Sequence, residues 1–326
     1  MQILIQIGLL VLGFIFLIKG ADIFVSGSSA LARNFNVPGL IIGLTIVALG
    51  TSAPEMAVST VAAFQGSNEI ALSNVVGSNI FNLLCVLGLC AIISPLPVDR
   101  IVLKRDFPFS IITTVFLLLI SCTAVLRDGL FFNAAMDTVV TEVTRLMGFI
   151  LIVLFMGYII LLIVKARKNS KDEEQGDKEP IWKCVLFIFI GLVLIISGGQ
   201  AVVYSAKEIA RAAGMTETLI GLTIVAVGTS LPELVTSAVA ARKGETGMAI
   251  GNVIGSNIFN LLFILGVSAL IHPVAVNMAS VYDLIILVLI SVISYLFAAT
   301  SDRIARTEGI MMVMIYAADV VFAVLR

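Results

Sequence analysis

The chain has 326 residues, of which 60% are hydrophobic and only 13% charged, and its formal net charge is -1. A soluble domain carries about 25% charged residues, so this composition excludes an ordinary soluble protein. The sequence predicts a protein that crosses a lipid bilayer several times, and nothing in it indicates a nucleic-acid partner.

A helix needs about 20 apolar residues to cross the hydrocarbon of a bilayer, and ten segments of the chain fit this description. In chain order they are residues 4–33, 39–63, 70–93, 107–126, 147–164, 183–205, 217–241, 247–270, 281–299 and 308–325. The predicted fold class is therefore an all-α polytopic membrane protein with ten transmembrane helices.

One stretch between these segments is soluble in character. Residues 165–183 hold six basic and five acidic side chains and no apolar period, which is typical of a flexible linker. The chain thus divides into a first repeat at 1–164, a charged linker at 165–182 and a second repeat at 183–326. Each repeat holds five spans, an odd number, so the second repeat must enter the membrane inverted relative to the first.

The distribution of Lys and Arg predicts the orientation. The loops after the odd-numbered spans hold 14 basic residues, against 5 on the opposite side. Because basic loops stay in the cytoplasm, we expect the linker to be cytoplasmic and both termini to be extracytoplasmic. The predicted location is the cell (inner) membrane, and we expect a monomer.

The chain contains the same block twice. Residues 43–84 align without a gap to residues 221–262, and 27 of the 42 aligned positions are identical. Among the identical positions are the polar pairs Thr51/Thr229, Ser52/Ser230, Glu55/Glu233, Ser78/Ser256 and Asn82/Asn260. An ionisable group at the centre of a membrane helix costs roughly 2.5 to 3.5 kcal/mol, so these glutamates indicate function.

Each copy also carries a proline in mid-span, within GTSAPE and GTSLPE. Proline lacks an amide hydrogen, so Pro54 frees the carbonyl of Gly50, and Pro232 frees that of Gly228. Irregular backbone at membrane depth is tolerated where it is buried in protein or lines a wet cavity. We therefore expect two broken helices whose carbonyl oxygens face something polar, such as a cation.

The side chains agree with a cation site. Thr51, Ser52 and Glu55 share one helix face, as do Thr229, Ser230 and Glu233. Ser78 and Asn82 are four residues apart, and so are Ser256 and Asn260. All these groups offer oxygen, which selects hard cations such as Ca²⁺ and Na⁺. The four cysteines show no CxxC spacing, and neither a thiolate metal site nor a cofactor is expected.

The charge of the two glutamates indicates exchange. One Ca²⁺ or two Na⁺ would neutralise Glu55 and Glu233, whereas an empty site would leave buried carboxylates unpaired. The alternative reading, an ion pair, has no support because neither copy has a basic residue near mid-depth. For the glycines of the repeated block, Gly43, Gly77, Gly221 and Gly255, close helix packing is the competing role.

The pairing of GTSxPE with GSNIFN in both halves resembles the two signature repeats of the sodium/calcium exchanger family, within the calcium/cation antiporters, and is most similar to prokaryotic members with ten helices. The resemblance implies Glu55 and Glu233 as central ligands of Ca²⁺, shared with Na⁺. It further implies that the first and sixth helices slide across the other eight, and that about three Na⁺ exchange for one Ca²⁺. The remaining implied ligands are Thr51, Ser52, Thr229, Ser230, Ser78, Ser256, Asn82, Asn260 and the backbone carbonyls of Ala48 and Ala226.

One position departs from the family pattern. Many relatives carry Asp where this chain has Asn260, so the site has one possible charge fewer. The number of Na⁺ bound and a role for K⁺ or H⁺ stay open, although Met56 and Leu234 replace the His that often follows the glutamate in proton-coupled members. A cation channel is the alternative from another class. An enzyme is not expected, because the positions shared by the two copies include no His, Lys or Asp.

Overall fold

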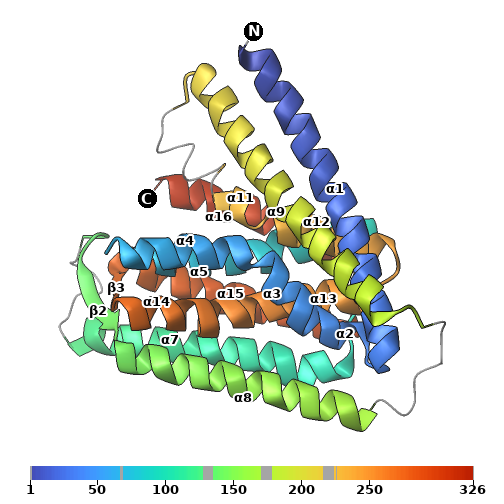
Figure 1. Ribbon diagram of the computed structural model, residues 1–326. Helices are drawn as coiled ribbons and strands as arrows, with labels where there is room; N and C mark the ends of the chain where they lie inside the picture. Colours follow the sequence, from blue (N-terminus) through green and yellow to red (C-terminus); the bar gives the residue numbers. More distant parts are fainter. Residues whose placement is uncertain are drawn as a thin grey trace.

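The computed structural model describes residues 2–66, 69–127, 135–169, 178–215, 224 and 226–325, and they are mostly helical (Figure 1). The first-half elements, with η marking a π-helical turn, are α1 (Gln2–Phe35), α2 (Gly39–Ile42), η1 (Gly43–Val47), α3 (Ala48–Thr51), α4 (Ala53–Phe64), α5 (Glu69–Phe81), η2 (Asn82–Val86), α6 (Leu87–Ile93), η3 (Val102–Asp106), α7 (Phe107–Arg127) and α8 (Arg145–Asn169). The second-half elements are α9 (Ile181–Ala212), α11 (Ala226–Thr229), α12 (Leu231–Arg242), α13 (Thr246–Ile258), η6 (Phe259–Ile264), α14 (Leu265–Ile271), α15 (Met278–Thr300) and α16 (Arg306–Leu325).

Within these described residues, seven helices are long and apolar enough to cross a membrane, or eight if one bent pair counts as a single span. All ten expected segments contain helical elements, although the segment 217–241 lies partly outside the described residues. Helices suit the bilayer because each backbone polar group is paired inside its own segment. The prediction of a helical, multi-span membrane protein is confirmed.

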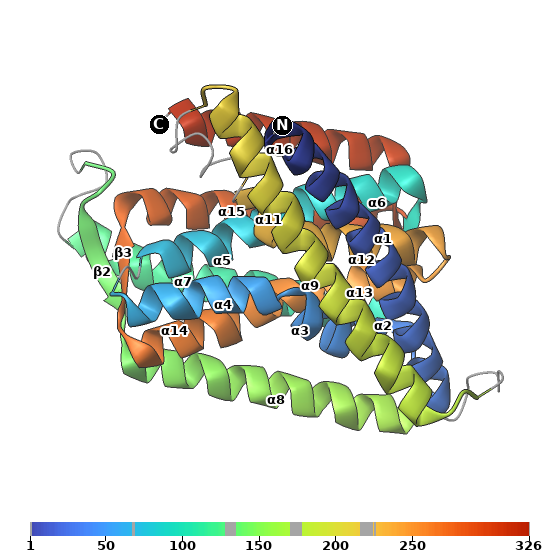
Figure 2. The same cartoon turned by 45° about the horizontal axis from the view of Figure 1, so that its top comes forward.

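The helices α1 and α9 form a pair that crosses the remaining helices obliquely (Figures 1 and 2). Glycines seven residues apart line their seam. A Cβ atom on Gly20 would lie 2.9 Å from the carbonyl oxygen of Gly191, and one on Gly13 would lie 2.9 Å from that of Gly198. Small residues let membrane helices approach this closely, so the pair is packed backbone against backbone.

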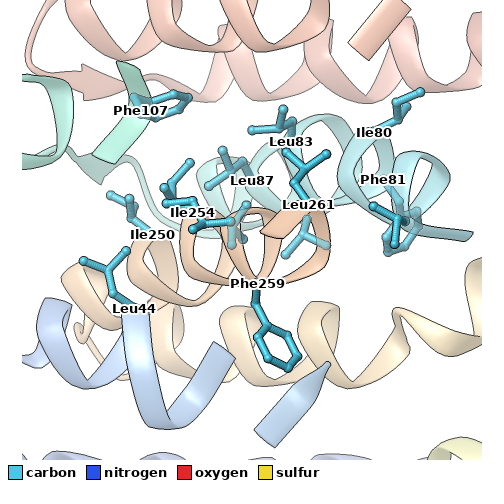
Figure 3. Packing of buried hydrophobic residues seen from close by; sticks show 14 of the residues in the cluster. Leu44, Ile80, Phe81, Leu83, Leu87, Phe107, Ile250, Ile254, Phe259 and Leu261 are labelled. Atoms are coloured by element: carbon cyan, nitrogen blue, oxygen red, sulfur yellow. The ribbon is translucent and has the colours of Figure 1, made fainter. Parts of the chain in front are cut away.

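The other long helices form a core whose two halves interlock. Figure 3 shows Leu83 and Leu87 of the first half packing toward Ile254 and Leu261 of the second. All four side chains are buried, each exposing 2% of its surface or less. Because membrane lipid is as apolar as leucine, close packing between these side chains, rather than escape from water, holds the halves together.

Two short strand pairs join the halves outside the helices. Strand β1 (Leu96–Pro97) pairs antiparallel with β4 (Arg303–Ile304), and β2 (Val139–Val143) pairs antiparallel with β3 (Val274–Asn277). The expected all-α fold therefore also contains these two short pairs of strands. These strands have two to five residues, too few for an alternating pattern to stand out from an interhelical loop.

The seam between α1 and α9 makes a first prediction. Gly20→Ala lowers the stability of the protein by about 1 to 3 kcal/mol, because the added methyl group has no room against α9. Thermal unfolding in detergent measures the change. Gly8→Ala is the matched control on the same helix, since an added Cβ there meets nothing within 4 Å. Equal melting temperatures for the two variants would contradict the close seam.

Candidate functional site

The two repeated blocks are broken at equivalent serines. Ser52 separates α3 from α4 with φ/ψ of -82°/11°, and Ser230 separates α11 from α12 with -92°/7°. In the first half the two segments are bent by 48°. Pro54 and Pro232 lie in the first turn of the helix that follows, where a missing N–H costs little. The predicted helix breaks are confirmed.

The breaks bring the two glutamates to one buried place. Glu55 and Glu233 are both 0% exposed and lie in the first turns of α4 and α12, where the positive end of the helix dipole favours negative charge. Ser52 Oγ donates a hydrogen bond to Glu233 Oε1 over 2.7 Å, and Ser230 Oγ donates one to Glu55 Oε1 over 2.9 Å. Each carboxylate is thus held by a hydroxyl from the opposite half.

The second oxygen of each carboxylate has no hydrogen-bond partner among the described residues. Glu55 Oε2 and Glu233 Oε2 are buried without a hydrogen bond, and no ion pair between described residues involves either glutamate. Four further site oxygens are likewise buried without a hydrogen-bond partner: Thr229 Oγ1, Ser256 Oγ, Asn82 Oδ1 and Asn260 Oδ1. Unpaired buried polar atoms are rare and call for an explanation; a bound cation would supply one.

The two predicted asparagines lie where their helices widen. Asn82 begins the π-helical turn η2, and Asn260 lies in η6; such turns often occur at functional sites. Asn82 Nδ2 donates to Asn257 Oδ1 over 3.2 Å, and Asn260 Nδ2 donates to Asn79 Oδ1 over 3.0 Å. Asn79 and Asn257 are not among the predicted ligands, although their identity in the two copies is a signal that marks them.

A second missed pair lies directly behind the glutamates. Asn74 Nδ2 donates to the carbonyl of Glu55 over 3.2 Å and to Ser59 Oγ over 2.9 Å. Asn252 Nδ2 donates in the same way to the carbonyl of Glu233 over 3.4 Å and to Ser237 Oγ over 2.9 Å. These bonds hold the first turns of α4 and α12 against α5 and α13.

The remaining predicted residues differ in what they contact. Thr51 Oγ1 lies 3.0 Å from Asn252 Oδ1 and 3.1 Å from the carbonyl of Val47. The carbonyl of Ala48 accepts the backbone N–H of Ser52 over 3.1 Å, so it is engaged in its own helix. Ser78 on α5 is 3% exposed, and Ala226 is the first residue of α11.

The candidate glycines also divide. A Cβ on Gly43 or Gly255 would collide with the backbone of the facing segment, so both serve close packing between 39–51 and α13. Gly77 has nothing within 4 Å of such a Cβ. Gly221 lies outside the described residues. Close contact between helices thus explains the glycines at positions 43 and 255.

The donor set of the site is oxygen, with two charges. Within the described ranges, no three His, Cys, Asp or Glu side chains gather into a metal site, so a cation here would depend on neutral oxygens beside the two carboxylates. Ca²⁺ takes six to eight such oxygens and tolerates irregular geometry. A surface cavity of about 360 Å³ elsewhere is lined by Asp99 and Glu245, among others, but not by either site glutamate.

Comparison with known proteins agrees with this chemistry. The family model described as sodium/calcium exchanger protein matches residues 5–164 and 183–325. The sodium/calcium exchanger MaX1 of Methanosarcina acetivorans is 34% identical over 96% of this chain and 97% of its own length. The putative antiporter CaxA of Alkalimonas amylolytica is 37% identical over 93% of this chain and 94% of its own length. A solved structure of the sodium-calcium exchanger NCX_Mj superposes with a TM-score of 0.81 and 34% identity, covering 99% of each chain.

The reciprocal serine contacts predict how binding responds to mutation. Ser52→Ala weakens Ca²⁺ binding about tenfold or more, because a hydrogen bond to a charged group contributes about 1.5 to 3 kcal/mol and here orients the carboxylate. Titration calorimetry on the purified protein measures the change. Ser121→Ala is the control, since the Ser121 hydroxyl bonds the Leu117 carbonyl of its own helix over 2.9 Å, away from the glutamates. Unchanged affinity of the Ser52 variant would show that this bond does not position the ligand.

Proposed function

The chain belongs to the sodium/calcium exchanger family, and on this premise we propose that it is a secondary active antiporter that exchanges Na⁺ for Ca²⁺ by alternating access. The observation that carries the proposal is the buried pair Glu55 and Glu233, each held by a serine of the opposite half and each with one unpartnered oxygen. A site of this kind is costly to leave empty. It therefore favours passage through an occluded state only when a cation is bound.

The ligands proposed for the cations include oxygens of both halves that have no hydrogen-bond partner among the described residues. Glu55, Glu233, Asn82, Asn260, Thr229 and Ser256 supply one each, and Thr51, Ser52, Ser230, Ser78 and the carbonyls of Ala48 and Ala226 complete the subsites. One Ca²⁺ balances the two carboxylates. Three Na⁺ would leave one positive charge in excess, so an exchange of about three Na⁺ for one Ca²⁺ would be electrogenic.

The proposed architecture is two inverted repeats of five helices, at 1–164 and 183–326, joined by the charged linker 165–182. The reciprocal bonds support it, because Ser52 relates to Glu233 as Ser230 relates to Glu55. In this arrangement both termini face outward and the linker lies in the cytoplasm, in the cell (inner) membrane, with a monomer as the transporting unit. The substrate site then lies at the interface of the repeats, as in other transporters with inverted repeats.

The α1–α9 pair is the element proposed to move. Its glycine seam makes the two helices one unit, and its contacts with the broken helices also run over glycine. A Cβ on Gly50 would lie 3.2 Å from the ring of Phe24 in α1, and one on Gly228 would collide with Val203 in α9. Both glycines directly precede the GTS threonines, so movement of the pair would expose or cover the site from either side.

Two other functions are distinguished by this site. A channel usually gathers its selectivity from several copies around an axis, whereas here two inverted copies share one buried pair of carboxylates. Proton or K⁺ coupling is the other candidate. The reading of Na⁺ as counter-ion is supported by a site whose donors are all oxygen and in which neither glutamate is followed by histidine.

Uptake of radioactive Ca²⁺ into Na⁺-loaded proteoliposomes tests the proposal. The wild type takes up Ca²⁺ only with an outward Na⁺ gradient, and Glu55→Gln and Glu233→Gln each lose most of this exchange because half of the site charge is gone. The surface variant Glu179→Gln is the control, since its carboxylate pairs with Lys183 outside the site over 2.8 Å.

Two results would contradict the proposal. Uptake that continues without a Na⁺ gradient, at channel-like rates, would exclude obligatory exchange. Normal exchange by either glutamine variant would place the site elsewhere. An imposed membrane potential completes the experiment: initial rates that ignore the potential would exclude three Na⁺ per Ca²⁺.

A contact between the moving pair and the core generates a further prediction. Lys243, which directly follows α12, pairs with Asp22 Oδ1 of α1 over 2.7 Å and donates to Ser26 Oγ over 2.7 Å. At the equivalent positions of the other half stand Gln65 and Gln200, whose side chains are exposed. The repeat therefore has this ion pair at α1 and no equivalent ion pair between Gln65 and Gln200. Sliding of α1 must break the contact between Lys243 and Asp22.

Lys243→Gln is therefore expected to reduce the population in which α1 is docked at this loop, by up to about fivefold, because a partly exposed ion pair contributes at most about 1 kcal/mol. Spin labels on α1 and α13 measure the two populations by their distance distribution. Exchanging the charges, with Asp22→Lys and Lys243→Asp together, restores the docked population. A distribution that is the same in the wild type and the Lys243 variant would mean that α1 does not leave this contact.

A further inference from the structure

We propose that Asn79 and Asn257 are positioning residues, which force Asn82 and Asn260 to turn their carbonyl oxygens, and not their amide nitrogens, toward the transported cation. The inference rests on the proposed function and assigns a role to two residues that are not ligands themselves. It explains why the side-chain amides of Asn82 and Asn260, which could rotate by 180°, present oxygen rather than nitrogen to the cation.

The four asparagines form a closed set of bonds between the halves. Asn82 Nδ2 of the first half donates to Asn257 Oδ1 of the second over 3.2 Å. Asn260 Nδ2 of the second half donates to Asn79 Oδ1 of the first over 3.0 Å. No bond in the set runs within one half, so the orientation of each ligand amide is decided by the opposite half.

Donor and acceptor counting fixes the outer two amides. A side-chain amide has an NH₂ group that only donates and an oxygen that only accepts. Because Asn82 and Asn260 use their nitrogens on Asn257 and Asn79, a flip of either would set oxygen against oxygen. Their own oxygens remain buried and unpartnered, which leaves them available for a cation.

The inner two amides are fixed in turn by backbone carbonyls. Asn79 Nδ2 donates to the carbonyl of Asn257 over 3.2 Å, and Asn257 Nδ2 donates to the carbonyl of Asn79 over 3.4 Å. A flip of Asn79 would therefore place its oxygen against a carbonyl oxygen. With both side chains exposed by 1% or less, water cannot compensate for the lost bonds, so one orientation of all four amides satisfies the set.

The hydrogen bond to Asn79 also requires a neutral amide at position 260. Asn260 has to donate to Asn79 Oδ1, and an ionised carboxylate at position 260 has no hydrogen to donate. A carboxylate oxygen at position 260 would then lie about 3.0 Å from Asn79 Oδ1, where the Asn260 nitrogen now donates a hydrogen bond. The set is thus built for a neutral amide at position 260, which keeps the site at two carboxylates.

A double-mutant cycle on Ca²⁺ uptake tests the inference. Asn79→Ala and Asn260→Ala each raise the apparent KM for Ca²⁺ about tenfold with little change in maximal rate, since both remove the same oriented oxygen. In the double variant the apparent KM is also raised only about tenfold, because the effects of residues that act through one another are not additive. The matched control combines Asn79→Ala with Asn82→Ala. These two changes affect different ligand oxygens, so their effects multiply and the apparent KM rises about a hundredfold.

A merely structural role for Asn79 would lower the yield, the melting temperature or the maximal rate while leaving KM unchanged. That result, or multiplicative effects of Asn79→Ala and Asn260→Ala, would overturn the inference. If Asn79→Ala does not fold, the mirror cycle of Asn257→Ala with Asn82→Ala gives the same test. Failure of the proposed function is recognised separately, because the wild type would then show no Na⁺-dependent uptake; the cycle is in that case read from Ca²⁺ affinities measured by calorimetry.

Discussion

The helices around the site are arranged to hold two buried carboxylates, and no basic residue within the described ranges pairs with either of them. Glu55 and Glu233 are fully buried, and each accepts a hydrogen bond from the serine that stands three residues before the other glutamate. In a low-dielectric interior such a pair is expensive unless something positive lies between them. The first turns of α4 and α12 and the two serine hydroxyls each reduce this cost. The amides of Asn74 and Asn252 hold those first turns in place through the backbone carbonyls of Glu55 and Glu233. None of these groups cancels the charge, whereas a bound cation would.

The fold can be understood as the means of holding this pair. Proline and serine break two helices so that each presents its amino-terminal end to the site, and glycines let neighbouring helices approach the breaks. Two short strand pairs tie the halves together outside the helices. Most contacts of α1 and α9 are with each other, which makes movement of the pair compatible with a rigid site.

Much of the site could be predicted from the sequence because the block occurs twice. Duplication identified Glu55 and Glu233, and Pro54 and Pro232 gave the position of the helix breaks. The partners of these groups could not be predicted, since the bond from Ser52 to Glu233 joins residues 181 positions apart. The duplication also marks Asn79, but the role proposed for it depends on the direction of an amide, which no spacing encodes. The contact of Lys243 with Asp22 and the short strands are likewise tertiary, and α11 begins beside residues outside the described range.

Anomalous diffraction from crystals soaked in Ca²⁺ would show whether both glutamates bind one ion. We expect one strong peak between the halves, with Glu55 Oε2 and Glu233 Oε2 each about 2.3 to 2.6 Å from the ion and with Asn82 Oδ1 and Asn260 Oδ1 facing it. A peak only in the surface cavity beside Asp99 and Glu245, or Ca²⁺ bound by one glutamate without the other, would contradict this expectation.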